Sequence, residues 1–277
     1  ASLRLADGFE AQGRLQLESF LIQVPDYGVH NDGTIEASFT QDALYMDQVD
    51  FVGEGTSIRI TGSVQKKGPR LQIGGQADLT LLSKVAPQIL KAEGTLSPRV
   101  AIEGSWDSVD VSGELDVDCK KLVIKGFPVK ISNVLGEATF KQDTMVLDAQ
   151  GNVAGGTFNA SGGIRMDGFR PAGYDVYTDF NDVTVKLVAG IPMGVEGRLA
   201  LQGGAEGEIP VLSGDVWVTR FRYTEDIKLA SIEDIGVVKP LSQVKTYDEA
   251  DDHVQLDVVL HGLENLEVVN NVAEGDF

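Results

Sequence analysis

The side chains that could do chemistry are few, and their spacing does not favour catalysis. The three histidines, His30, His253 and His261, include no pair at the helical spacing that would let two of them share a metal ion. The single cysteine, Cys119, excludes a thiolate zinc site and an internal disulfide, and its alternation with Leu115 predicts a small buried side chain. Nucleophile-elbow and phosphate-loop motifs are absent from the sequence. These residues favour a protein that is not an enzyme and that uses no cofactor and no metal ion.

Two acidic segments resemble parts of a cation site. The segment Asn31–Ala37 reads NDGTIEA, like the second half of a calcium loop, but Phe39 stands where that loop needs its bidentate glutamate. We therefore interpret it as a turn. The acidic cluster within Asp248–Asp252 is typical of a solvated loop.

Composition describes a chain that folds and that carries strong negative charge. The chain has 277 residues, of which 42% are hydrophobic, and its net charge is −19. That charge argues against binding to nucleic acid or to anionic lipid headgroups, and it favours an exterior that resists aggregation of sheet edges. The sequence has no apolar run of the 18 or more residues that a membrane-spanning helix needs.

The sequence repeats itself at a period of about 100 residues. The heptapeptide VSGELDV at Val111–Val117 returns as LSGDVWV at Leu212–Val218, an offset of 101. The segment Ala37–Asp47 returns with the same offset at Ala138–Asp148. We expect one continuous elongated domain, a fragment of a longer protein, made of a β-repeat at 1–103, a second at 104–204, and a partial third at 205–277 with an irregular, mobile insertion at 220–253.

Alternation with a period of two predicts that each repeat consists of strands. The segments Gly13–Glu18, Gly113–Asp118 and Gly197–Gln202 place apolar residues on one face and polar residues on the other. Short strands are predicted at 34–39, 43–47, 57–61, 99–103, 122–125, 137–140, 144–148, 157–160, 175–178 and 215–219. A short helix is predicted at Leu81–Lys91, although Pro87 weakens its middle, and 186–195 forms at most a turn or two. The predicted fold is all-β: an elongated, curled, antiparallel-rich sheet with very little helix, shaped as a groove.

The alternation assigns a set of aliphatic and aromatic side chains to the inner face of this sheet. They are Leu15, Leu17, Ile58, Ile60, Val100, Ile102, Leu115, Val117, Met145, Leu147, Phe158, Leu199, Leu201, Val216, Val218, Leu256, Val258 and Leu260. These residues either form the core of a sandwich of two sheets or line a trough that binds acyl chains. The pattern alone does not separate the two.

The segment Gly113–Ile164 resembles the repeating unit of the TamB and AsmA-like family. It combines an alternating strand, a turn around Phe127–Lys130, a strand at Thr144–Asp148 and the glycine-flanked strand GGTFNASG at Gly155–Gly162. The order of Leu212–Tyr223, the irregular segment and Val254–Asn271 is similar to the C-terminal half of such proteins.

The resemblance implies a function that the residues do not show by themselves. Members of this family are anchored in the inner membrane of diderm bacteria by an N-terminal helix, which this chain lacks, and extend through the periplasm. They are similar to bridge-like proteins that carry phospholipid toward the outer membrane along an apolar groove. The chain is therefore expected to be a periplasmic segment of a lipid conduit that contacts phospholipid acyl chains and not nucleic acid.

Two other functions stay open. The first is an assembly or chaperone module for outer-membrane proteins or autotransporters, which offers sheet edges by strand addition and works with an Omp85-type outer-membrane barrel. The second is a structural or polysaccharide-binding repeat protein, which needs aromatic residues clustered on an outer face. With two tryptophans and six tyrosines, the sequence offers little support for such a cluster.

Overall fold

The structure, a computed structural model, is built almost wholly of β-strands. It describes residues 12–24, 27–127, 129–168, 170–185, 192–204, 209–223, 254–262, 266–269 and 274–276. Of these described residues 81% lie in strands and 3% in helices, and the strands form open, curled sheet. The predicted all-β class is therefore confirmed.

The chain divides into two compact units. The first consists of Ala1–Asn152 with Ala160–Ala172, and the second of Val153–Asn159 with Gly173–Phe277. The strands of the first unit begin with β1 (Gln12–Leu17), β2 (Leu21–Val24), β3 (Tyr27–Asn31), β4 (Ile35–Thr40), β5 (Ala43–Gly53), β6 (Thr56–Gln65) and β7 (Gly68–Asp78). They continue with β8 (Ile89–Ser105), β9 (Ser108–Ile124), β10 (Ile131–Lys141) and β11 (Thr144–Val153), while β12 (Gly156–Asp167) and β13 (Arg170–Val185) have residues in both units.

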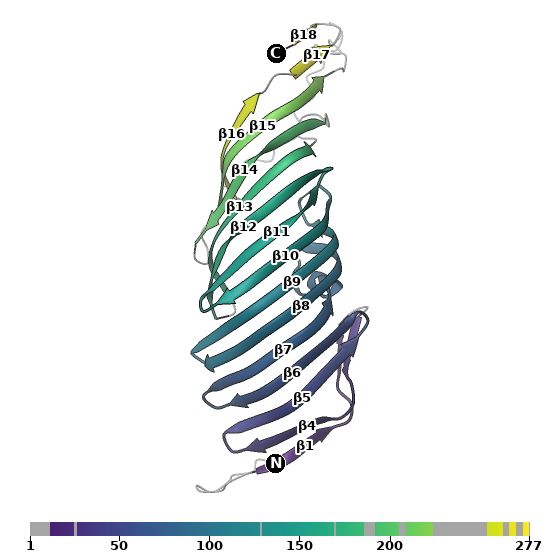
Figure 1. The fold of residues 1–277 in the computed structure, drawn as a ribbon, viewed down its shortest axis with the longest axis vertical. Coiled ribbons are helices and arrows are strands. Elements are labelled where there is room, and N and C mark those ends of the chain that lie inside the picture. Colours follow the sequence, from purple (N-terminus) through teal and green to yellow (C-terminus); the bar gives the residue numbers. More distant parts are fainter. Residues whose placement is uncertain are drawn as a thin grey trace, which may run out of the picture. The chain divides into compact units, whose positions relative to one another are not determined.

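Neighbouring strands of the first unit pair in antiparallel fashion. The strands from β4 to β10 follow one another as an antiparallel meander, and β1 pairs with the outer edge of β4 (Figure 1). The strands β8 and β9 are the longest, with 17 residues each. A tight turn at 66–67 joins β6 to β7, and another at 106–107 joins β8 to β9.

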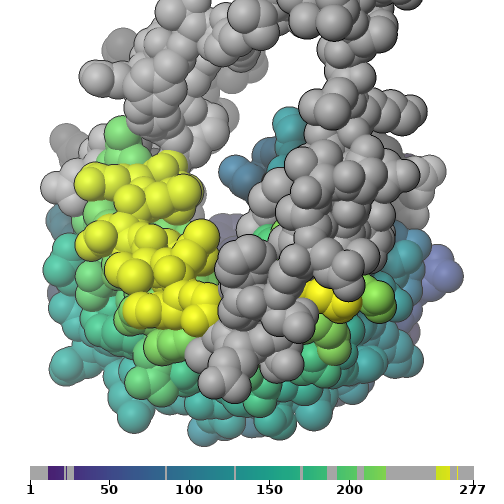
Figure 2. Space-filling model, turned by 90° about the horizontal axis from the view of Figure 1, so that it is seen from above, coloured from purple at the N-terminus to yellow at the C-terminus, as the bar shows by residue number. Residues whose placement is uncertain are grey.

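The second unit mixes antiparallel and parallel pairing. The strands β13, β14 (Met193–Gly203) and β15 (Val211–Tyr223) are antiparallel, but β15 pairs in parallel with both β16 (Gln255–Gly262) and β17 (Leu266–Val269). A short β18 (Glu274–Asp276) completes the described strands. In Figure 2 the green and yellow residues of this unit lie along a curved surface.

Glycine has a positive φ and a close backbone neighbour at equivalent places in the two units. Gly113 in β9 has φ 120°, and a Cβ built on it would lie 2.1 Å from the carbonyl oxygen of Arg99 on β8. Gly214 in β15 has φ 135°, and its Cβ would lie 2.2 Å from the carbonyl oxygen of Arg198 on β14. Only glycine fits such a close backbone approach, which is how a sheet is kinked into a curl. These two glycines stand at the same place in the repeated heptapeptide.

The predicted helix is shorter than the sequence suggested. A 3-10 turn, η1 (Leu79–Leu81), leads into a single helical turn, α1 (Leu82–Val85), and β8 already begins at Ile89. The helix prediction for Leu81–Lys91 is wrong beyond Val85, because Pro87 disfavours a helix there and the following residues pair with β9. The second predicted turn at 186–195 lies mostly outside the described residues, and β14 occupies Met193 onward.

Most predicted strands are present but longer than expected. The strand predicted at 99–103 is the end of β8, and that at 43–47 is the first half of β5. The strand β7 was not predicted at all. The irregular segment assigned to 220–253 begins too early, since β15 continues to Tyr223, and its remainder lies outside the described residues.

Candidate functional site

One face of the sheet in the first unit is apolar from strand to strand. Residues directly opposite each other in a ladder point to the same side of the sheet. One such row crosses β5 to β10 through Val49, Ile60, Ile73, Val100, Gly113 and Phe140. A second row crosses β1 and β4 to β9 through Leu15, Ala37, Met46, Gly62, Leu71, Ile102 and Val111. We call this side the apolar face of the first unit.

The second unit has an apolar face of the same kind. One row joins Val176, Leu201, Leu212 and Leu256 across β13 to β16. The next two rows join Thr178, Leu199, Gly214 and Val258, and then Phe180, Gly197, Val216 and Leu260. Alternation along each strand therefore translates into apolar rows that run across the strands.

These faces remain partly open to solvent. Among the described residues, nine hydrophobic side chains are buried: Ala37, Val49, Ala77, Leu79, Ala92, Cys119, Val183, Val195 and Val216. Most of the predicted lining residues are only half-buried. Leu15 keeps 49% of its surface exposed, and Leu256 and Leu260 keep 69% and 68%.

Two small clusters cover part of the apolar faces. In the first unit Leu79 of η1 packs against Ala92 and Cys119, and Val117 joins this cluster from β9. In the second unit Val183, Val195 and Val216 form a cluster that Leu199, Val218 and Val258 flank. Of the predicted lining residues, Val216 is therefore buried in a local core, and Val117, Leu199, Val218 and Val258 pack against one.

The structure shows which predicted lining residues share a face. Ladder register places Leu15, Leu17, Ile58, Ile60, Val100, Ile102, Leu115 and Val117 on the apolar face of the first unit. It places Leu199, Leu201, Val216, Val218, Leu256, Val258 and Leu260 on that of the second. Met145, Leu147 and Phe158 are half-buried in β11 and β12.

Sequence reasoning missed several members of the apolar face. Leu71 and Ile73 belong to β7, where the glycines and the proline of GPRLQIGG obscured the alternation. Val49 lies beyond a register shift in β5, which changes the parity of the pattern there. The alternation within Leu71-Gln72-Ile73 was the signal that could have found this strand.

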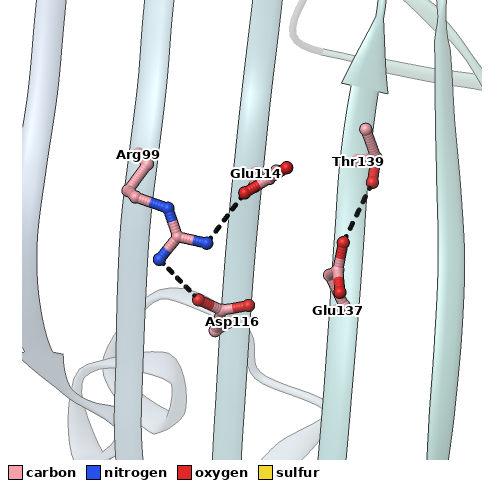
Figure 3. A network of polar contacts seen from close by, with 5 residues as sticks. All are labelled: Arg99, Glu114, Asp116, Glu137 and Thr139. Atoms are coloured by element: carbon pink, nitrogen blue, oxygen red, sulfur yellow. Dashed lines mark hydrogen bonds and ion pairs between the residues drawn. The ribbon is translucent and has the colours of Figure 1, made fainter.

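The opposite face carries ion pairs between neighbouring strands. Arg99 on β8 donates to Glu114 at 2.8 Å and to Asp116 at 2.7 Å, both on β9, while Thr139 donates to Glu137 on β10 (Figure 3). The hydrogen bonds that Arg99 donates to Glu114 and Asp116 raise the pKa of Arg99 above its usual range. We call this side the polar face.

Charge pairing continues on this face at β5 and β6. The Arg59 guanidinium donates to Asp50 at 2.7 Å, and this hydrogen bond, with a further one from Gln48, lowers the pKa of the Asp50 carboxyl. The pKa of Glu93 is lowered by its hydrogen bond with Lys91. Charges on this face are thus held in pairs across or along the strands.

The described residues offer little for catalysis or metal binding. Within the ranges that the structure describes, no group of three or more histidine, cysteine, aspartate or glutamate side chains could hold a metal ion. Burial raises the pKa of the Cys119 thiol, which makes it a poor nucleophile. The arrangement is suited to binding apolar chains on one face and to contact with water on the other.

Comparison with known proteins finds no relative of this chain: no family model, no curated protein and no solved structure matches it. Among the residues with a described position, no helix is both long enough and apolar enough to cross a bilayer.

Proposed function

We propose that the chain is a segment of a lipid-carrying protein that binds phospholipid acyl chains on its apolar faces. The observation that carries this proposal is the set of continuous aliphatic rows across β5 to β10 and β13 to β16, most of whose members are only half-buried. Soluble proteins rarely expose contiguous apolar surface of this kind unless it binds something.

Acyl chains match this surface physically. Each methylene that leaves water contributes about 0.8 kcal/mol, so a chain lying along several rows gains enough to stay bound without any specific contact. The rows offer hydrophobic area and no fixed polar group that would hold a lipid in one place. Such a surface favours acyl chains that slide along it over acyl chains that bind tightly at one position. No single lining residue is essential on this account, because each supplies one side chain to a continuous surface.

The wider setting rests on the resemblance to the TamB and AsmA-like family. On that basis the chain acts in the periplasm of a diderm bacterium, between the inner and outer membranes. An Omp85-type barrel is the partner that the same resemblance suggests. The curled sheet supports the groove that this proposal needs.

The test is lipid analysis of the purified chain by native extraction and mass spectrometry. We expect phospholipid to co-purify with the natural chain and to be reduced in Leu115→Asp, which places a charge on the apolar face between Pro98 and Ala138. The matched control is Ser112→Asp, which adds the same charge to the same strand on the polar face.

The outcomes separate the possibilities. Phospholipid bound equally by both variants contradicts the proposed binding face. A folded natural chain that carries no lipid, and takes none from vesicles, contradicts the conduit itself.

One observation favours strand addition as a second candidate. The strand β16 exposes large hydrophobic side chains on both of its faces, with Leu256 and Leu260 on one and Val259, 52% exposed, on the other. A strand of this kind is suited to accept an unfolded β-segment. Capture of an outer-membrane hairpin peptide, lost when Val259 is replaced by lysine, would favour this function over lipid transport.

A further inference from the structure

The polar face of the second unit is hollowed over β12 to β15. The hollow has a volume of about 770 Å³. Its lining includes Tyr177, Asp179, Glu196, Arg198, Asp215 and Trp217. Ladder register places Asp179, Arg198 and Asp215 in one row across three strands, on the side opposite to the lipid-binding rows. The charged side chains of the hollow therefore lie on the face opposite to the apolar rows, although Phe180, Gly197 and Gly214 of those rows also line it.

The hollow arises where the sequence repeat is broken. In the first copy Arg99 lies opposite Glu114 and bonds both Glu114 and Asp116. In the second copy Arg198 lies opposite Asp215, but the residue equivalent to Asp116 is Trp217. An aromatic ring thus replaces a carboxylate at a polar surface position. Arg198 bonds Asp179 on β13 at 2.6 Å instead.

Neighbouring side chains contact the Trp217 and Tyr177 rings of the hollow. His261 on β16 stacks on Trp217 with ring centroids 5.0 Å apart and an interplanar angle of 15°. The same histidine contacts Asp215 through Nε2 at 2.6 Å. The Tyr177 hydroxyl donates to Asp175 at 3.0 Å, and Gln202 donates to the other oxygen of that carboxylate. Rings fixed in this way lose little conformational entropy when a ligand stacks on them.

The distance between the Tyr177 and Trp217 rings indicates an elongated site. Tyr177, Ala200 and Ser213 lie opposite one another in one row, and Trp217 lies four residues further along β15. A rise of about 3.4 Å per residue and a strand spacing of about 4.8 Å put the two aromatic positions about 17 Å apart. Between them lies the charged row of Asp179, Arg198 and Asp215. A ligand that touches both rings must be an extended chain.

The charges of the hollow select against charged ligands. An anionic chain would meet the carboxylates of Asp179, Glu196 and Asp215. A cationic chain would meet Arg198 at the centre, and the two carboxylates beside it already have partners in Arg198 and His261. A neutral chain with many hydroxyl groups can donate to carboxylates, accept from the guanidinium and place its apolar faces on aromatic rings.

We propose that this hollow binds a neutral oligosaccharide, with Trp217 and Tyr177 as stacking platforms and Asp179, Arg198 and Asp215 as hydrogen-bonding partners. The two platforms lie in separate strands, so a short linear chain that reaches both binds better than a monosaccharide. This binding is independent of lipid transport, because its stacking and hydrogen-bonding side chains lie on the opposite face of the sheet.

Trp217 itself reports binding. The chain has two tryptophans, and Trp106→Phe leaves Trp217 as the only one. Titrating this variant with cellotetraose, maltotetraose and the tetramer of N-acetylglucosamine should give a saturable change in tryptophan emission with at least one of them. The corresponding monosaccharides should bind at least tenfold more weakly.

Two variants and a matched control locate the site by calorimetry in the otherwise natural chain. Trp217→Asp installs the residue that the first copy carries, and Tyr177→Ala removes the other platform. Each should weaken tetrasaccharide binding at least tenfold. Tyr45→Ala should leave it unchanged, since Tyr45 is a polar-face tyrosine of the first unit with the same 43% exposure as Tyr177.

Three results would overturn the proposal. They are the absence of binding by all three tetrasaccharides at millimolar concentration, binding that Trp217→Asp and Tyr177→Ala leave intact, and a Trp217 response to tetralysine but to none of the sugars. Because lipid co-purification is measured separately, a failure here leaves the lipid proposal in place, and the reverse also holds.

Discussion

At the scale of single residues, the bent strands depend on glycines whose backbones no other residue can adopt. Gly113 combines φ 120° with an approach to the carbonyl oxygen of Arg99 that leaves no space for a Cβ. The same arrangement recurs at Gly214 with Arg198. The repeat in the sequence is thus visible in the structure as a repeated close approach of two backbones, which requires glycine.

Replacing Gly113 with alanine should destabilise the chain strongly. The added Cβ clashes with backbone that cannot rotate away, and the positive φ is strained for alanine, so we expect a loss of at least about 2 kcal/mol in the free energy of unfolding. Urea denaturation followed by circular dichroism measures it. The control is Gly74→Ala, where the nearest atom to the new Cβ is 3.9 Å away and the change should be neutral or stabilising. Equal losses in the two variants would contradict the kink interpretation.

The pair of Asp50 and Arg59 gives a pH-dependent prediction. The folded-state pKa of Asp50 lies below its ordinary 3.8, first because Arg59 donates a hydrogen bond to it. Its contribution to stability is therefore present above pH 3.8 and is lost as the pH falls through the lowered pKa. Arg59→Gln should lower the urea midpoint slightly at neutral pH, and the difference should shrink in acid and in high salt. A difference that grew on acidification would contradict this sign.

At the scale of elements, the alternation within each strand was readable from the sequence, but the strand lengths were not. The polar–apolar template at Gly113–Asp118 was recognised, yet β9 extends from Ser108 to Ile124. A strand ends where its neighbour stops offering backbone hydrogen bonds, and the sequence of one strand does not show where its neighbour stops. The strand β7 was missed because glycines weaken a pattern locally while the partners β6 and β8 stabilise it.

The candidate site, too, could be predicted from the sequence only in part. Which side chains are apolar and alternate could be predicted from residues such as Leu115 and Leu199. The rows that join them could not, because register shifts such as that between Met46 and Val49 depend on pairing. The hollow around Trp217 was missed because Tyr177 lies 40 residues away in the sequence and meets it only through β14.

The turn formed by η1 and α1 should act as a local anchor on the apolar face. Leu79 is 1% exposed and packs against Ala92 and Cys119, so Leu79→Ala should cost about 2 to 4 kcal/mol in the free energy of unfolding. Leu90→Ala removes the same atoms from a side chain that is 59% exposed, and it should cost far less. Urea midpoints of the two variants make the comparison. Similar losses would show that Leu79 does not form a core.

At the scale of the whole molecule, one face of each unit is apolar and the other carries paired charges. The net charge of −19 keeps a chain rich in strands and exposed aliphatic groups in solution. The apolar faces would otherwise associate, because half-buried rows of leucine, isoleucine and valine attract one another in water. Acidic residues on the polar face oppose this association through charge repulsion.

The division of the sheet into two faces predicts which positions meet lipid. A photoreactive benzoylphenylalanine should capture phospholipid when it replaces Leu115 or Leu201, which lie on the apolar faces, and should capture little when it replaces the adjacent Glu114 or Gln202. The two positions of each pair are neighbours in the same strand. They therefore share the same local stability and differ in the face of the sheet that they occupy. Cross-linked lipid is measured by mass spectrometry after irradiation in the presence of phospholipid vesicles. Labelling confined to Leu115 and Leu201 assigns the acyl chains to the apolar rows, whereas equal labelling within each pair would show that lipid contacts the chain without regard to its faces.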